Sequence, residues 1–256
     1  MRINLLFALG MLFLFSCTTS KELTYFSDLP ETTEYSENIT NNKEPKIQPD
    51  DLLSITISSL NPEANALFNK GVMLSAGNAG AAGTSKDEEG YLVDSNGFIE
   101  LPVLGKVKVG GLTKQEAKAM LVKNLNNYLK EPSVYIRYMN FRVTVVGEVK
   151  NPATFTIPSE KINVLEALGL AGDMTAYGIR DNVLLIREEN GVRKAARLNL
   201  KSKALLSSPY FYLQQNDVVY VEPNKVRTIQ ATTNTRNITL LFSLISVTTL
   251  IVSRLL

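Results

Sequence analysis

Residues 141–170 read FRVTVVGEVKNPATFTIPSEKINVLEALGL and contain the pattern that decides the fold. The stretch opens with alternating apolar and polar residues, which is the period of a half-buried strand. Asn151 and Pro152 then form a turn into a second alternating segment. Asn163 is the expected N-cap of a short helix that ends near Gly172. This order of strand, turn, strand and helix predicts an α+β domain.

The same domain continues toward the C-terminus. Residues 182–200 have the pattern of a hairpin, and its turn contains Asn190 and Gly191, a strong signal for two paired strands. Residues 213–221 (LQQNDVVYV) add a turn followed by a strand. We therefore expect one β-rich domain with a single helix over residues 140–223.

A second set of elements precedes it, over residues 45–139. Residues 47–57 (IQPDDLLSITI) begin with a turn and continue as a strand. Residues 112–129 repeat apolar residues at helical spacing, with Thr113 as the N-cap and Glu116 closing a capping box. These patterns predict another α+β domain, N-terminal to the domain over residues 140–223.

Turns and an insertion separate the elements of both domains. Residues 71–90 contain five Gly together with Ala and Ser, which predicts a flexible insertion. The residues that we expect at structural turns are Asp50, Asp51, Gly97, Gly147, Asn151, Pro152, Gly172 and Asp217. Turn chemistry explains the carboxylates among them better than acid–base catalysis does.

Short phrases recur in the two domains. Residues 47–55 and 213–221 each place an Asp-containing turn before a strand, and residues 105–108 resemble residues 147–150. The repeats predict two related β-rich units with one helix apiece.

The N-terminus has the pattern of a secretory signal. Residues 1–16 have one positive charge and an apolar stretch that is too short to span a bilayer. Cys17, the only Cys of the chain, follows a small residue and precedes polar sequence, which resembles the lipobox of bacterial lipoproteins. The resemblance implies that Cys17 is the site of lipid attachment, whereas the alternative is an incidental Cys. Residues 17–44 are polar without a sustained period, so we expect a lipid-anchored tether.

The C-terminus is also apolar. After a linker over residues 224–237, residues 238–256 have the length and composition of a transmembrane helix with one charge. Its polar side chains gather on one side at about 100° per residue, and a ring of such helices would enclose a polar lumen. The expected pore-lining residues are Thr239, Ser243, Ser246, Ser253, Arg236 and Arg254. The alternatives are contacts in a simple dimer and hydroxyl groups that bond back to their own helix.

Composition excludes several classes of function. The 256 residues have a net charge of +2, without the basic cluster that a nucleic-acid partner would need. The absence of His and the single Cys argue against a metal site, redox chemistry or a disulfide scaffold. We expect no metal, no cofactor, no catalytic residues and no enzymatic activity.

The order of these motifs resembles the bacterial outer-membrane polysaccharide export proteins. The phrases that carry the resemblance are IQPDDLLSITI, VDSNGFIELPVLGKVKVGGLTKQEA, FRVTVVGEVKNPATFTIPSEKINVLEALGLAGD and LQQNDVVYVEP, which together cover roughly residues 45–223. The resemblance implies a polysaccharide-export domain over residues 45–139 and a β-grasp (SLBB) domain over residues 140–223. The single β-grasp unit and the insertion over residues 71–90 depart from larger members of the family.

The same resemblance implies a function and partners. Members form ring-shaped homo-oligomers, often octamers, whose C-terminal helices surround a pore in the outer membrane for capsular polysaccharide or exopolysaccharide. It also implies soluble domains in the periplasm and an inner-membrane polysaccharide co-polymerase, often a tyrosine kinase, as partner. The main alternative is a lipid-anchored periplasmic glycan-binding or envelope-assembly protein without a pore.

Overall fold

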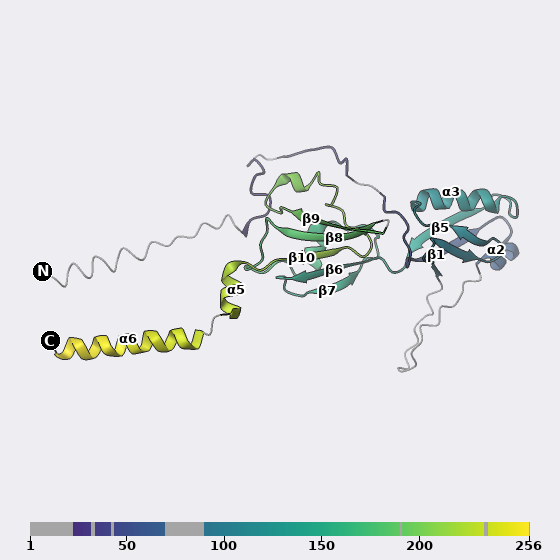
Figure 1. The fold of residues 1–256 in the computed structure, drawn as a ribbon. Helices are drawn as coiled ribbons and strands as arrows, with labels where there is room; N and C mark the ends of the chain where they lie inside the picture. Colours follow the sequence, from purple (N-terminus) through teal and green to yellow (C-terminus); the bar gives the residue numbers. More distant parts are fainter. Residues whose placement is uncertain are drawn as a thin grey trace, which may run out of the picture.

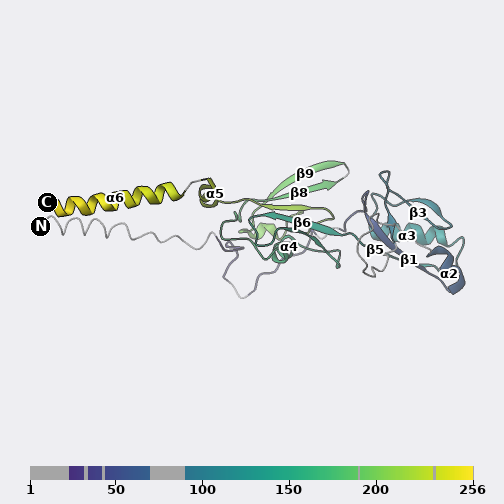
Figure 2. The same ribbon diagram turned by 90° about the horizontal axis from the view of Figure 1, so that it is seen from below.

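The computed structural model describes residues 23–31, 34–41, 44–69, 90–189, 191–232 and 235–255. Two α+β domains follow one another, and a C-terminal helix extends from the second domain on the side opposite to the first (Figures 1 and 2). The predicted signal peptide, Cys17 and almost all of the predicted insertion lie outside the described residues.

The first domain is built around a three-stranded antiparallel sheet in the order β2-β1-β5. Its elements are β1 (Leu52–Ser58), α2 (Pro62–Phe68), β2 (Tyr91–Leu92), β3 (Phe98–Leu101), β4 (Gly105–Lys108), α3 (Lys114–Leu125) and β5 (Ser133–Tyr138). Strands β3 and β4 form a separate hairpin. Helix α3 lies along the sheet (Figure 1).

Strand alternation produces the core of this domain. Leu53, Ile55 and Ile57 of β1 point inward and are buried, while the residues between them are more exposed. Helix α3 covers this apolar face with Ala117, Leu121 and Leu125, which are fully buried. The predicted capping box at the start of α3 is confirmed: the Thr113 hydroxyl accepts from the Glu116 N–H, and the Glu116 carboxylate accepts from the Thr113 N–H.

The second domain contains a five-stranded sheet in the order β7-β6-β10-β8-β9, with α4 on one side of it (Figure 2). Its elements are β6 (Arg142–Gly147), β7 (Ala153–Thr156), α4 (Val164–Leu170), β8 (Val183–Glu189), β9 (Val192–Leu198), η3 (Lys203–Leu205) and β10 (Val218–Val221). Strands β6 and β10 are parallel, whereas the remaining neighbours are antiparallel. The predicted hairpin is confirmed as β8 and β9, and Asn163 caps α4 as predicted.

Gly147 ends β6 at a point where two backbones approach closely. Its φ is +96°, and a Cβ atom there would lie 2.1 Å from the Val221 carbonyl oxygen. Neither condition is compatible with an L side chain, so this position requires glycine.

Two helices follow the second domain, α5 (Lys225–Thr232) and α6 (Thr235–Leu255). The helix predicted over residues 238–256 is therefore present, but its prediction as a transmembrane span is not supported. Among the helices that the structure describes, none combines the length and the apolar character needed to cross a membrane.

The segment ahead of the first domain follows the surface of the second domain. The Tyr25 hydroxyl donates to Asp173, and the Phe26 N–H donates to the Leu200 carbonyl at 3.0 Å. The Asp28 carboxylate accepts from the hydroxyl of Ser202 at 2.7 Å. Within the predicted lipid-anchored tether over residues 17–44, these contacts hold residues 25–28 along the second domain.

Candidate functional site

A cleft of 440 Å³ opens between the second domain, the start of α3 and the segment that leads into the first domain. Its lining includes Asn41, Glu44, Lys114 and residues of the loop from Tyr210 to Gln214. The volume falls within the range of about 300–1,000 Å³ typical of small-molecule sites. The cleft is therefore large enough to be considered as a binding site.

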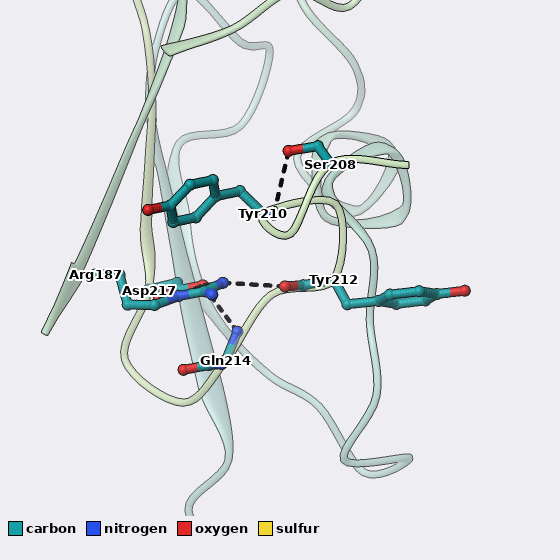
Figure 3. Close-up of polar contacts among 6 residues, drawn as sticks. All are labelled: Arg187, Ser208, Tyr210, Tyr212, Gln214 and Asp217. Carbon is teal, nitrogen blue, oxygen red and sulfur yellow. Dashed lines mark hydrogen bonds and ion pairs between the residues drawn. The ribbon is translucent and has the colours of Figure 1, made fainter. Parts of the chain in front are cut away.

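Arg187, which lines the cleft, forms an ion pair with Asp217 (Figure 3). Arg187 Nε lies 3.0 Å from Asp217 Oδ1, and Arg187 Nη2 lies 2.7 Å from Oδ2. The second nitrogen also donates to the Tyr212 carbonyl at 3.0 Å. Burial raises the pKa of Asp217, while the guanidinium beside it opposes that rise. The pair is thus a charged, bidentate bridge inside the domain.

Two tyrosines of the preceding loop also line the cleft. The Tyr210 ring lies over the Arg187 guanidinium, with 5.3 Å between the guanidinium carbon and the ring centroid. The Tyr212 ring points away from Arg187 (Figure 3), and Lys161 Nζ lies 4.5 Å from its centroid. Both rings are only partly buried. The cleft therefore offers aromatic surface as well as polar groups.

The remaining charges of the cleft are largely paired. Lys114 forms an ion pair with Glu160, and Lys194 Nζ lies 2.7 Å from Glu189 Oε2. These contacts leave the cleft polar but close to electrically balanced. The part of the chain that the structure describes contains no group of acidic, His or Cys residues that could hold a metal ion.

Chemically, the arrangement is suited to binding. Arg187 is held by a carboxylate and a carbonyl, and its guanidinium stays protonated, so it can donate hydrogen bonds to a ligand. The tyrosines offer rings and hydroxyl groups, which can contact a ligand with both apolar and polar surfaces.

The turn residues predicted from sequence lie at bends of the backbone. Positive φ angles occur at Asp50, Gly97, Gly147 and Gly172, while Asn151 and Pro152 follow the end of β6. Asp51 and Asp217 are buried and close two similar turns. Only Asp217 belongs to the cleft region, through Arg187.

The predicted pore-lining residues lie on α6, away from the cleft. Ser243 and Ser246 are exposed, and their hydroxyl groups donate to carbonyl oxygens three residues earlier, at 2.8 and 2.9 Å. Arg254 is exposed as well. Cys17 and the side chains of Thr239, Arg236 and Ser253 lie outside the described part of the structure.

The cleft residues Arg187, Tyr210, Tyr212 and Lys161 were not predicted as site residues from the sequence. A signal was present, because Arg187 interrupts a mostly apolar strand and two tyrosines flank Phe211 directly before a turn. Neither pattern reveals that the residues meet, since β8 and the loop are far apart along the chain.

Two matches with known families agree with this two-domain architecture. Residues 40–139 match the polysaccharide biosynthesis/export protein family, and residues 141–221 match the SLBB domain. The class defined by the fold and these matches is a polysaccharide-export domain followed by an SLBB domain. Residues 40–139 thus form a domain of the polysaccharide biosynthesis/export type, and residues 141–221 form an SLBB domain.

Two curated relatives bear the same name. Over 109 residues the chain is 33% identical to the EPS I polysaccharide export outer membrane protein EpsA of Ralstonia nicotianae, a match that covers 41% of this chain and 29% of the relative. Over 139 residues it is 29% identical to EpsA of Ralstonia solanacearum, covering 53% and 37% of the two chains. The matches thus span about a third of each relative. Both are named outer membrane proteins, in agreement with the predicted localisation.

Proposed function

We propose that the protein is the outer-membrane component of a polysaccharide export system and forms an oligomeric channel. The observation that carries this proposal is the order of the export domain and the SLBB domain on one chain. The exported polymer is a capsular polysaccharide or an exopolysaccharide. The proposal further includes acylation at Cys17 and an inner-membrane polysaccharide co-polymerase as partner.

In this proposal the copies form a ring in which the polar side of α6 faces the interior. Ser243, Ser246 and Arg254 supply that side among the described side chains. Leu244 and Ile245 are 67% and 58% exposed in a single chain. An assembly would bury such apolar side chains against neighbouring copies.

The test combines native mass with thiol labelling. Detergent-extracted protein should have the mass of a closed ring, and a monodisperse monomer would contradict the channel. In the assembled protein, Ser246→Cys should react with a water-soluble thiol reagent, whereas Leu244→Cys should be protected. Equal labelling of Ser246→Cys and Leu244→Cys would contradict the proposed orientation of α6. Deletion of the gene should abolish the appearance of polysaccharide outside the cell.

The cleft favours a second candidate, a lipid-anchored periplasmic protein that binds glycans without forming a pore. Its aromatic and polar lining is compatible with a sugar ligand whether or not a channel exists. The native-mass measurement separates the two candidates, because this alternative requires no ring.

A further inference from the structure

The cleft beside Arg187 has features that the fold of the second domain does not require. Tyr210 and Tyr212 keep part of their rings accessible, although large aromatic side chains gain most from complete burial. Arg187 is only 5% exposed, yet it lines the cleft. A buried guanidinium next to accessible aromatic rings is the kind of surface that orients a ligand.

Arg187 retains hydrogen-bonding capacity toward the cleft. Its Nε and Nη2 atoms are occupied by Asp217 and by the Tyr212 carbonyl. Among the described residues, its Nη1 atom makes no hydrogen bond. This atom carries two donors in a fixed plane, so it can serve one or two acceptor oxygens of a ligand.

The aromatic part of the site is made accessible by a movable side chain. Lys161 covers the Tyr212 ring at 4.5 Å but is itself exposed, on a flexible four-carbon stem. A ligand ring can therefore replace the ammonium group on Tyr212 without disturbing the core. Sugar rings suit such an exchange, because their carbon–hydrogen faces are apolar and their edges carry hydroxyl groups.

The charges of the cleft indicate which sugars fit. Lys114, Lys194 and Arg187 are each paired with a carboxylate. Lys161 and Glu44 have no ion pair among the described residues, and their charges are opposite. The cleft therefore has no excess of positive charge that would favour an acidic ligand. Its paired charged groups can still form hydrogen bonds with the hydroxyl groups of a neutral sugar.

We infer that this cleft binds a short stretch of a neutral sugar chain, in which one unit stacks on Tyr212 and a neighbouring unit places a hydroxyl oxygen at Arg187 Nη1. The inference rests on the proposed function, since it identifies the sugar as part of the exported polysaccharide. Because the cleft is electrically balanced, binding should depend only weakly on salt concentration.

Calorimetry on the full-length protein tests the inference, in a detergent without a sugar headgroup. The probes are the neutral oligosaccharides maltoheptaose, cellopentaose and mannopentaose, with trigalacturonate as the acidic comparison. At least one neutral probe should bind, and Tyr212→Ala should weaken that binding about tenfold, while Tyr212→Phe retains it. Tyr135→Ala is the matched control, because Tyr135 is an exposed tyrosine on the first domain. Absence of binding by every neutral probe, or equal binding by Tyr212→Ala, would overturn the inference.

Lys161→Ala provides a second variant at an exposed position that the fold does not depend on. A neutral-sugar site should keep or improve its affinity, because the ring of Tyr212 becomes more accessible. A site for acidic ligands would instead lose affinity for trigalacturonate, and that result would contradict the inference. Export is measured separately: if gene deletion stops export but the wild type binds no neutral probe, only this inference fails. If the wild type binds while deletion leaves export normal, the proposed function fails.

Discussion

The turns over residues 48–51 and 214–217 have the same backbone design in two different domains. In each, the first N–H donates to the Asp carboxylate that closes the turn, at 2.7 Å for Gln48 and 2.8 Å for Gln214. The third residue has a positive φ in both, +67° at Asp50 and +64° at Asn216. Both turns lead directly into a strand, β1 or β10.

The two buried carboxylates differ in their surroundings. Asp217 is bridged by Arg187, whereas Asp51 Oδ1 has no hydrogen-bond partner among the described residues. Burial raises the pKa of Asp51 to about 6, and the neighbouring Asp50 charge adds to the rise. One backbone turn thus accommodates either a carboxyl group that is paired with a guanidinium or a carboxyl group without a cationic partner.

The largest expected effect comes from Asp217→Asn. The substitution leaves Arg187 buried without its anionic partner, which should lower the free energy of unfolding by about 3–5 kcal/mol. Urea denaturation measures the change. The double variant Arg187→Met with Asp217→Asn is the control, because it removes both charges, keeps an oxygen that can accept from the Gln214 N–H, and should recover much of the loss. If Asp217→Asn unfolds at the same urea concentration as the wild type, the ion pair does not stabilise the second turn.

The matched substitution in the first domain, Asp51→Asn, should act in the opposite direction. A pKa near 6, against the ordinary 3.8, means that ionisation of Asp51 costs the folded state about 3 kcal/mol above pH 6. The wild type should therefore lose stability as the pH rises from about 4 to about 6, because the folded state binds the proton more tightly. Asp51→Asn should remove this slope and raise stability at pH 7.5. Parallel pH profiles for the two proteins would contradict the assigned cause.

Asn140 allows the connection between the two turns to be tested. Its side chain accepts from the Leu52 N–H and donates to the Asp50 carbonyl, both at 2.9 Å. Its own carbonyl accepts from Gln215 at 2.7 Å. Asn140→Ala should cost about 1–2 kcal/mol and increase amide hydrogen exchange at Leu52, with little change in the second turn. Asn140→Asp is the comparison variant: it keeps the acceptor for the Leu52 N–H but replaces the donor with a carboxylate oxygen that repels the Asp50 carbonyl.

The smallest effects should come from the residues with positive φ. Asp50→Gly and Asn216→Gly relieve a left-handed backbone at the cost of a more flexible unfolded chain, so each should change stability by less than about 1 kcal/mol. Asp50→Gly also removes a negative charge near Asp51 and should lower the pKa of Asp51, which NMR titration can follow. An unchanged Asp51 titration would show that the two carboxylates are not coupled.

The similarity of the turns could be predicted because it is local. Residues 47–55 and 213–221 each contain a turn with Asp followed by an alternating strand, and both signals lie within nine residues. The capping residues Thr113 and Asn163 were predictable for the same reason, since a cap and its partner are three residues apart.

The contacts that distinguish the turns could not be predicted, because they join distant parts of the chain. Arg187 reaches Asp217 from another strand, and Asn140 contacts both turns from the junction between domains. The membrane-spanning prediction for residues 238–256 depended on length and an apolar majority, and among the helices that the structure describes none has the length and apolar character to cross a membrane. The binding of Tyr25 to the second domain was missed because a polar segment without hydrophobic periodicity does not indicate which side chains contact another part of the protein.

That docked segment sets a mechanical limit on the molecule. Tyr25 is eight residues after Cys17, and a fully extended chain spans at most about 3.6 Å per residue. With Cys17 acylated, as we propose, the second domain at Tyr25 lies within about 29 Å of the lipid-bearing residue. A pull on the lipid is then transmitted first to Tyr25, Phe26 and Asp28, and so to the second domain before the first. The position of the first docked residue therefore sets the greatest distance between the lipid and the second domain.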